Sequence, residues 1–482
     1  MNYGLLTLEI GVVLAGLAVL LADLWVPTEM RRKLSHAAAG FLGLLLLLSF
    51  TRLIDTGTAG TAFGGMYIQD SMALFFKRLF LVAAVIVLVL SFDYADRLPA
   101  AAIGEYAALM LFALAGMMLA ASANDLSVLF VSVELITVSF YVLVSFQRSR
   151  TLSLEAGVKY LIIGALASAL MVYGIALVYG TAGSMNFDRV AEAAPELRGN
   201  RIFLLGVLLV LAGLGFKIAA FPMQLWAPDV YQGSPTPTTA FLAVGSKAAG
   251  FALLLRVIHS AVPDLEAWLG SVVAVVAGIT ILYGNLCAIP QRNLKRLLGY
   301  SSISNAGYML LGVAAMNAAG QSAVLFFLGA YLVSVLGAFL VIGLVTRDAE
   351  SEDISVLAGL NQRAPLLAFT LSLSMISLAG IPPLAGFFGK FLLLKAVVEQ
   401  ARSNPGYVWL LAVALVGIVI SLYYYFGVIR AIYWSNETEV TDPIPVSRPM
   451  QYAVVFCAAG MLYLGLFPGG LIEAALAAMQ AL

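Results

Sequence analysis

The chain has 482 residues, of which 62% are apolar and only 11% are charged. Soluble domains carry about 25% charged residues, so this composition excludes a soluble globular protein and indicates a membrane protein. The 26 basic and 26 acidic residues cancel, which gives no reason to expect nucleic acid as a partner. Cys287 and Cys457 are far apart without a second ligand nearby, so neither a disulfide framework nor a metal centre is expected.

Apolar runs follow one another along the whole chain, separated by charges or by Gly, Pro and Asn clusters. About 20 apolar residues cross a membrane as a helix. The first run has no basic segment before it and no small-residue cleavage site, so we interpret it as a span, not as a signal peptide. The sequence therefore predicts an all-α polytopic membrane protein with about fourteen transmembrane helices, at 4–24, 34–51, 75–92, 102–121, 125–146, 155–180, 202–221, 237–261, 267–289, 296–316, 321–345, 364–400, 406–433 and 449–476.

Basic residues in the predicted connections indicate the orientation. The compact clusters Arg31–Lys33 and Arg292–Arg296 fall on one side, which the positive-inside rule makes the inner side. Both termini are then outside. This assignment places Lys295 in an inner loop, and Lys77 and Arg256 in outer connections.

Charged residues inside the predicted spans include five lysines and two glutamates. A charge at mid-membrane costs about 2.5–3.5 kcal/mol on insertion scales, so such residues need internal partners or water and are candidates for function. Glu134 lies in the middle of the fifth run, whereas Glu105 lies early in the fourth and is expected at the interface. The lysines are Lys159, Lys217, Lys247, Lys390 and Lys395.

Two of the predicted spans contain prolines that should interrupt them. Pro222 follows Lys217 in the seventh run, and Pro382-Pro383 precedes Lys390 in the twelfth. Proline removes a backbone donor and clashes with the preceding turn, and broken helices persist in a membrane only where they line protein or water. The 173-residue spacing of Lys217 and Lys390 suggests two inverted five-helix repeats, with spans 4–8 and spans 9–13 corresponding. The expected divisions are 1–101, 102–261, 262–433 and 434–482.

The charged residues are suited to moving protons. A lysine holds its proton while a carboxylate is near and can release it when the pair separates, so Glu134 with Lys217 forms a switchable pair. Lys247 and Lys390 would extend this relay along the midplane. Alternatives remain at each position: a structural ion pair for Glu134 and Lys217, an ordinary helix pair with Glu155 for Lys159, and snorkelling for Lys395. Asp229 is expected to be a cap or turn residue, and Tyr423–Tyr425 to serve in packing or interface anchoring.

The stretch from Gly215 to Lys247, which includes Phe221-Pro222-Met-Gln-Leu-Trp226 and Gln232-Gly-Ser-Pro-Thr-Pro237, closely resembles the antiporter-like subunits of NADH:quinone oxidoreductase, and among them the N subunit. Leu154–Tyr160 and Ala379–Phe391 extend the resemblance to the whole chain. The M-type subunit resembles this pattern with glutamate at 390, and the L-type has a lateral helix for which this chain is too short.

The resemblance implies a bacterial inner-membrane subunit with periplasmic termini that moves protons through Glu134, Lys217, Lys247 and Lys390, with Lys159 as a further candidate. It implies no cofactor in this chain, and FMN, iron–sulfur clusters and quinone in other subunits of the complex. Expected partners are the M-type subunit, small K-, J- and A-type subunits, and lipids. A subunit of a multisubunit cation/proton antiporter and a non-conducting scaffold remain alternatives.

Overall fold

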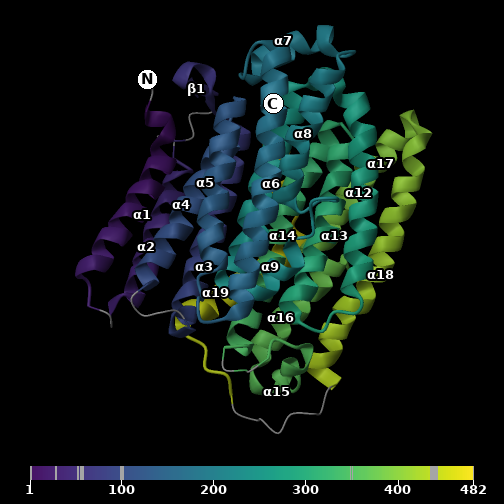
Figure 1. Ribbon diagram of the computed structural model, residues 1–482. Helices are drawn as coiled ribbons and strands as arrows, with labels where there is room; N and C mark the ends of the chain where they lie inside the picture. Colours follow the sequence, from purple (N-terminus) through teal and green to yellow (C-terminus); the bar gives the residue numbers. More distant parts are fainter. Residues whose placement is uncertain are drawn as a thin grey trace.

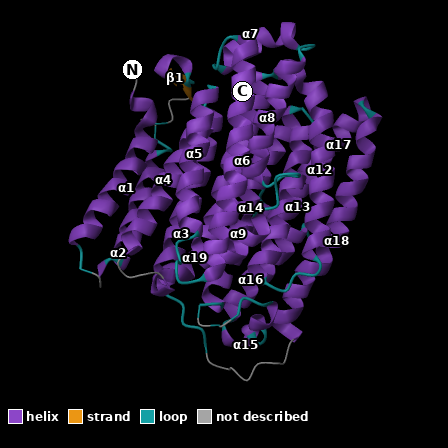
Figure 2. Ribbon diagram, in the orientation of Figure 1, coloured by secondary structure: helices purple, strands orange, loops and turns teal. Residues whose placement is uncertain are grey.

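The protein is a bundle of long helices, with one small two-stranded sheet at an end of the bundle (Figures 1 and 2). The computed structural model describes residues 3–27, 30–51, 54, 59–97, 102–347, 349, 351–434 and 443–480. Eleven helices in these residues are long and apolar enough to cross a membrane. The predicted class, an all-α polytopic membrane protein, is therefore confirmed.

The N-terminal part packs α1 and α3 beside a short hairpin. Strands β1 and β2 pair antiparallel, with Thr61 opposite Ile68. The elements are η1 (Tyr3–Leu6), α1 (Thr7–Trp25), α2 (Arg32–Leu48), β1 (Gly60–Ala62), η3 (Phe63–Gly65), β2 (Tyr67–Gln69), α3 (Ser71–Tyr94) and η4 (Ala95–Arg97).

The middle of the chain forms the first set of core helices. These are α4 (Ile103–Ala121), α5 (Leu126–Val144), α6 (Thr151–Ala182), the surface helix α7 (Phe187–Leu197), α8 (Arg201–Ile218), α9 (Ala227–Gly233), α10 (Thr236–Phe241) and α11 (Lys247–Arg256). Two π-helical turns flank α11, η6 (Leu242–Ser246) before it and η7 (Val257–Ala261) after it. Every residue from Thr236 to Arg256 is buried, so this stretch lies in the centre of the bundle.

The second set of core helices follows. It consists of η8 (Pro263–Leu265), α12 (Glu266–Ala288), α13 (Leu294–Ala314), α14 (Ala318–Val345), η9 (Ile354–Leu357), α15 (Leu360–Arg363), α16 (Pro365–Ala379), α17 (Ala385–Ser403), η10 (Pro405–Tyr407) and α18 (Val408–Trp434). The chain ends with α19 (Arg448–Leu466) and α20 (Gly469–Met479). The run predicted at 449–476 is thus two helices, because Pro468 disfavours helical geometry at Phe467 before it.

Short connections and polar caps start many of the spans. Asp70 accepts a hydrogen bond from the amide of Ala73 at 2.7 Å, and Asp125 accepts one from Ser127 at 2.8 Å. Asn293 and Asn317 cap α13 and α14 in the same way. These side chains satisfy amides that would otherwise have no partner at a helix N-terminus.

Two helices are interrupted where the prolines predict. Helix α8 ends at Ile218, followed by Ala219 with φ +57°, and the chain resumes as α9. Helix α16 ends at Ala379, followed by Gly380 with φ +85°, and the chain resumes as α17. The two breaks are 161 positions apart, whereas the two lysines are 173 apart. Lys217 therefore precedes its break and Lys390 follows its own, so these lysines do not occupy matching positions relative to the breaks.

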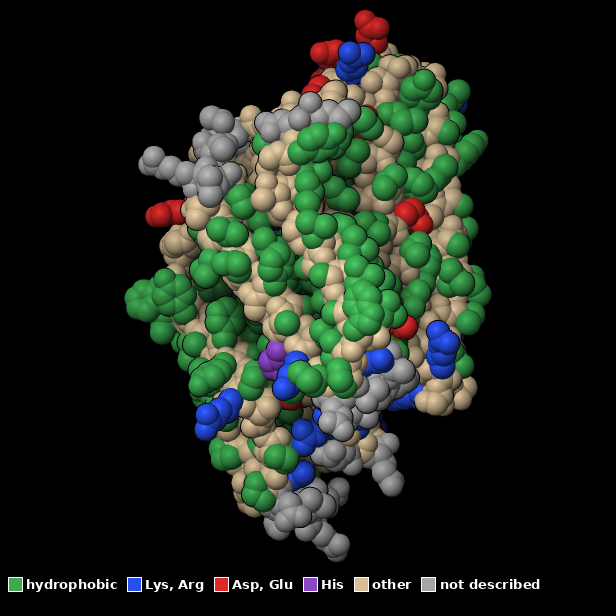
Figure 3. Space-filling view, turned by 90° about the vertical axis from the view of Figure 1, so that its left-hand side faces the viewer, with side chains coloured by type: hydrophobic (Ala, Val, Ile, Leu, Met, Phe, Trp, Pro, Cys, Tyr) green, Lys and Arg blue, Asp and Glu red, His purple; other side chains and the backbone are tan. Residues whose placement is uncertain are grey.

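The chain starts and finishes at the same end of the bundle, where α7 also lies, while α15 lies at the opposite end (Figure 1). Most lysine and arginine side chains visible in Figure 3 gather toward that opposite end, which we call the basic end. The basic end carries the connection between α5 and α6 and the start of α13. The end with the termini is called the terminal end.

Candidate functional site

Glu134 lies in the middle of α5 and is half-buried. The hydroxyl of Ser168, on α6, donates a hydrogen bond of 2.5 Å to its Oε1. No ion pair within 4.0 Å joins Glu134 to Lys217 among the described residues. The expected pair is therefore open in this structure, with the carboxylate held by α6.

Lys217 lies in the last turn of α8, directly before the break. Its side chain is only 3% exposed, and its Nζ has no hydrogen-bond partner in the described part of the chain. The space beside it exists because Gly250 on α11 has no side chain: a Cβ there would meet Lys217 Cβ at 3.0 Å. A buried ammonium group without a partner is costly, so Lys217 is a candidate for function and not only for structure.

Lys247 begins α11, immediately after the π-helical turn η6. Its Nζ donates hydrogen bonds to the Ser302 carbonyl at 2.5 Å and to the Ser302 hydroxyl. Tyr231 and Tyr331 bond the same hydroxyl at 2.9 and 3.0 Å. Lys247 therefore ends in a buried cluster of three hydroxyl groups, each able to accept one proton and donate another.

Lys390 lies in α17, six residues into the helix that follows the second break. Its Nζ donates a hydrogen bond of 2.7 Å to the carbonyl of Leu378, at the end of α16, and lies 4.6 Å from the ring centroid of Tyr308. The three lysines Lys217, Lys247 and Lys390 are all buried, and each adjoins irregular backbone. The prediction that Lys217 and Lys390 lie near interrupted helices agrees with the structure, and Lys247 is buried within its predicted span. The roles of all three lysines stay predictions.

A second group of polar residues was not singled out from the sequence. Tyr425 of α18 shares a 2.5 Å hydrogen bond with the Ser301 hydroxyl and accepts one from Asn305. Tyr424 donates to Asn285 of α12 at 3.0 Å. Tyr424 and Tyr425 are buried, which agrees with the packing role predicted for them, but the sequence did not predict their hydrogen bonds. The signal was the Ser301-Ser-Ile-Ser-Asn305 run inside a predicted span, since a buried helix with four polar side chains in five positions needs internal partners.

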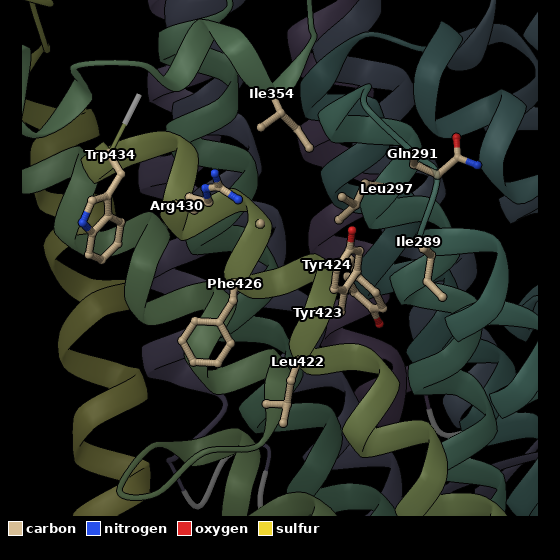
Figure 4. Close-up of a pocket in the computed structure, with 11 residues that line it drawn as sticks. Ile289, Gln291, Leu297, Ile354, Leu422, Tyr423, Tyr424, Phe426, Arg430 and Trp434 are labelled. Carbon is tan, nitrogen blue, oxygen red and sulfur yellow. The ribbon is translucent and has the colours of Figure 1, made fainter. Parts of the chain in front are cut away.

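A cavity of about 860 Å³ reaches this group from the basic end (Figure 4). Tyr424 lies among its lining residues, between Ile289 and Leu297 and the side chains of α18. Arg430 lines the same cavity. The cavity therefore extends to a tyrosine that bonds Asn285 in the interior.

Lys159 has a different environment from the buried lysines. It forms ion pairs of 2.7 Å with both Glu155 and Asp229, and its side chain is 41% exposed. Asp229, in the first turn of α9, also pairs with Arg296 of α13. Asp229 is therefore an ion-pair centre joining α6, α9 and α13, and not a simple turn residue as expected. Lys395 lies on the exposed side of α17 and pairs with Glu399 at 3.7 Å, which confirms the alternative in which it points outward.

Three basic residues that the sequence placed in connections are buried instead. Lys77 lies in α3 and pairs with Glu9 at 2.7 Å. Arg256 pairs with Asp70 at 2.7 Å, and Lys295 pairs with Glu352 at 2.9 Å. Hydropathy misplaced them because each charge is neutralised by an acid that is distant in the sequence, so the helix extends past the charge.

Within the described residues, no group of three His, Cys, Asp or Glu side chains is arranged to hold a metal ion. The site is thus a set of buried lysines, one carboxylate and hydroxyl groups at two interrupted helices. This combination defines a polytopic membrane protein with ionisable side chains buried in its interior.

Comparison with known proteins extends this assignment. Residues 123–421 match the family model described as NADH:quinone oxidoreductase/Mrp antiporter, TM. The NADH-quinone oxidoreductase subunit N of Desulforamulus reducens is 41% identical over 99% of this chain and 98% of its own. The same subunit of Heliobacterium modesticaldum is 42% identical over 100% of both chains. The chain belongs to the NADH:quinone oxidoreductase/Mrp antiporter family, and within it to the N subunits of NADH-quinone oxidoreductase.

Solved structures agree with this membership. A chain in respiratory complex I from Thermus thermophilus with bound aureothin is 33% identical, with a TM-score of 0.82, over 98% of this chain and 100% of that one. A chain in the Mrp complex from Dietzia sp. DQ12-45-1b, 23% identical, has a TM-score of 0.84 over 100% of this chain and 98% of that one. The second likeness shows the shared fold alone.

Proposed function

We propose that this subunit translocates protons through a buried relay that includes Glu134, Lys217, Lys247 and Lys390, coupled to quinone reduction elsewhere in the complex. The observation that carries the proposal is the position of Lys247. Its ammonium group lies on Ser302, where two tyrosine hydroxyls converge. Groups of this kind exchange protons, whereas a fixed structural lysine would face a carboxylate.

The relay begins at the open pair. Glu134 is bonded to Ser168 and Lys217 has no partner, so approach of the carboxylate to Lys217 would favour the charged lysine, and separation would favour proton release. Protons then pass from Lys217 to Lys247, through the hydroxyls of α13 and α18, and on to Lys390. Lys159 acts at the edge of this path through its ion pair with Asp229.

The proposed setting is the bacterial inner membrane, with the basic end in the cytoplasm and both termini in the periplasm, as the positive-inside rule requires. FMN, iron–sulfur clusters and quinone are placed in other subunits. The neighbours are an M-type antiporter-like subunit, small K-, J- and A-type subunits, and lipids. The proposed divisions are 1–101, 102–261, 262–433 and 434–482, with the middle two as inverted repeats.

Substitutions at Lys217 test the relay in membrane vesicles with the subunit content measured in parallel. Lys217→Ala should lower pumping and the coupled quinone reductase rate by roughly 10²-fold, the range of a lost proton-transfer group, while the subunit content is retained. Lys217→Arg should also lower them, because arginine does not release its proton. Lys247→Ala should act like Lys217→Ala.

A structural ion pair reverses this order: Lys217→Arg is tolerated and Lys217→Ala destabilises the subunit by leaving Glu134 unpaired. Full proton pumping by both Lys217→Arg and Lys247→Ala would contradict the proposed relay. The antiporter alternative is tested by co-purification. Flavin and iron–sulfur subunits should accompany this chain, and their absence together with sodium/proton exchange would favour the antiporter.

A further inference from the structure

Lys295 is a fully buried lysine that the relay above does not use. It lies in the first turn of α13 at the basic end, with none of its side chain exposed. Its Nζ forms an ion pair of 2.9 Å with Glu352 and donates a hydrogen bond of 3.0 Å to the carbonyl of Ser234, which ends α9. Lys295 therefore links the surface acid Glu352 to the broken helix.

Glu352 lies in the connection between α14 and η9 and is held firmly. Arg150 donates a hydrogen bond of 3.2 Å to its Oε1, and Asn293 donates one of 3.4 Å to its Oε2. The backbone pairs as well: the amide of Leu294 donates to the Glu352 carbonyl at 2.9 Å. Burial raises the pKa of the Glu352 carboxyl, but Lys295 and Arg150 lower it more, so the pKa lies below its usual value. Glu352 is thus a carboxylate, and Arg97 is a further cation near the pair.

A cavity of about 360 Å³ at the basic end is lined by Arg97, Gln147, Ser149, Arg150, Ala349 and Glu352. Lys295 is not among its lining residues. The acid therefore contacts the cavity at the surface, and the lysine lies behind it in the protein. Proton uptake requires the acid to lie between the cavity and the lysine. An ion pair that only stabilised the structure would not need this arrangement.

Lys295 and Ser302 are on one side of α13. They are seven residues apart, which is two helical turns and about 10 Å. Between them, a Cβ at Gly299 would meet Pro228 Cα at 3.1 Å and Tyr231 Cβ at 3.4 Å, so α9 lies directly against α13. Tyr231 reaches from this contact to the Ser302 hydroxyl at 2.9 Å. Tyr231 therefore connects the α9–α13 contact beside Lys295 with the hydroxyl cluster that binds Lys247.

We infer that Glu352 and Lys295 form a proton-uptake pair that supplies Lys247 from the basic end. The inference rests on the proposed function, in which Lys247 belongs to the relay. In the resting state the pair is carboxylate and ammonium. Lys295 passes its proton inward toward Tyr231 and Ser302 and becomes a neutral amine. Glu352 then takes a proton from the cytoplasmic side and transfers it to that amine, which restores both charges.

Inside-out membrane vesicles test the inference, because their outer surface is the cytoplasmic face. The quinone reductase rate is measured with an uncoupler present, so that weak acids cannot act through the proton gradient. Glu352→Gln should lower the rate at least about tenfold, as expected for loss of a proton-transfer group. Formate in the medium should restore much of the rate in a second variant, Glu352→Ala, where the shortened side chain leaves room for formic acid to reach Lys295 and protonate it. Asp353→Asn is the matched control and should leave the rate unchanged without formate.

Lys295→Arg distinguishes proton uptake through Lys295 from a purely structural role, called a clamp, of its ion pair with Glu352. Arginine preserves the ion pair with Glu352 but does not release its proton, so uptake predicts a low rate with normal subunit content. A clamp predicts a normal rate. Full activity of either Glu352→Gln or Lys295→Arg would overturn the inference. So would loss of the Glu352→Gln subunit from the membrane, or failure of formate to raise the rate of Glu352→Ala. Lys247→Ala, measured beside them, distinguishes this failure from failure of the whole relay.

Discussion

The ammonium group of Lys390 donates a hydrogen bond of 2.7 Å to the carbonyl of Leu378, across the break between α16 and α17. The last carbonyls of a helix lack partners and carry partial negative charge, so a lysine there stabilises the open end of α16. Gly380 is required at this point. Its φ is +85°, and a Cβ would lie 2.9 Å from Lys390 Cδ. Lys390 thus has both a structural contact and a position in the proposed relay.

Substitution at Lys390 should separate these two roles. Lys390→Arg keeps a donor for the Leu378 carbonyl but should lower proton pumping by roughly 10²-fold, because arginine retains its proton. Pumping by vesicles, corrected for subunit content, is the measurement. Lys395→Ala is the control, since that lysine is exposed and pairs weakly with Glu399 at 3.7 Å. Equal pumping by Lys390→Arg and wild type would assign Lys390 to structure alone.

Two tyrosines of α18, one buried and one exposed, allow a second test of the relay. Tyr425→Phe removes the hydrogen bond to Ser301 and leaves Asn305 without that acceptor, so the coupled quinone reductase rate should fall several-fold. Tyr423 is 70% exposed, and Tyr423→Phe should leave the rate unchanged. Rates of both variants are measured in the same membranes. An unchanged rate in Tyr425→Phe would remove α18 from the path.

The buried ion pair of Asp70 and Arg256 should contribute to stability rather than to pumping. Arg256 donates to both Asp70 carboxylate oxygens, at 2.7 and 2.9 Å, and to the Ala121 carbonyl. Arg256→Leu leaves a buried carboxylate unpaired and should cost about 3–5 kcal/mol. The double substitution with Asp70→Leu should recover part of that loss. Thermal denaturation of the purified complex is the measurement, and a double variant less stable than Arg256→Leu alone would contradict the pairing.

The two ends of the bundle should face opposite compartments. In a chain with Cys287 and Cys457 replaced, a cysteine at Gly199, beyond α7, should react with a membrane-impermeant thiol reagent from the periplasm. A cysteine at Gln362, in α15, should react only from the cytoplasm. Labelling of both positions from one side would contradict the arrangement in Figure 1.

Local patterns were enough to predict the breaks and the buried lysines. Pro222 and Pro382 change the backbone wherever they stand, and a lysine within an apolar run has few structural uses, so Lys217, Lys247 and Lys390 were identified without the fold. The exposed position of Lys395 also follows from its place on α17, about 140° around the helix from Lys390.

Long-range pairing could not be predicted in the same way. Lys77 is neutralised by Glu9, and Lys295 by Glu352, at separations that no local pattern reports. Ser302 and Tyr425 are ordinary residues until α13 and α18 meet. The environment of Glu134 depends on Ser168 of the neighbouring helix, so the sequence could predict a switchable pair with Lys217 but not that the pair is open in this structure.

The two π-helical turns that flank α11 determine how this helix is rotated about its axis. Each turn accommodates one residue more than an α-helical turn would, and together they set the rotation of the segment between Lys247 and Arg256. Conversion of η6 to regular α-helix would turn α11 by about 100° and carry Lys247 away from Ser302. The contact between Lys247 and the hydroxyl cluster therefore depends on the winding of one backbone turn. A change in that winding would break the contact without a change in any charge.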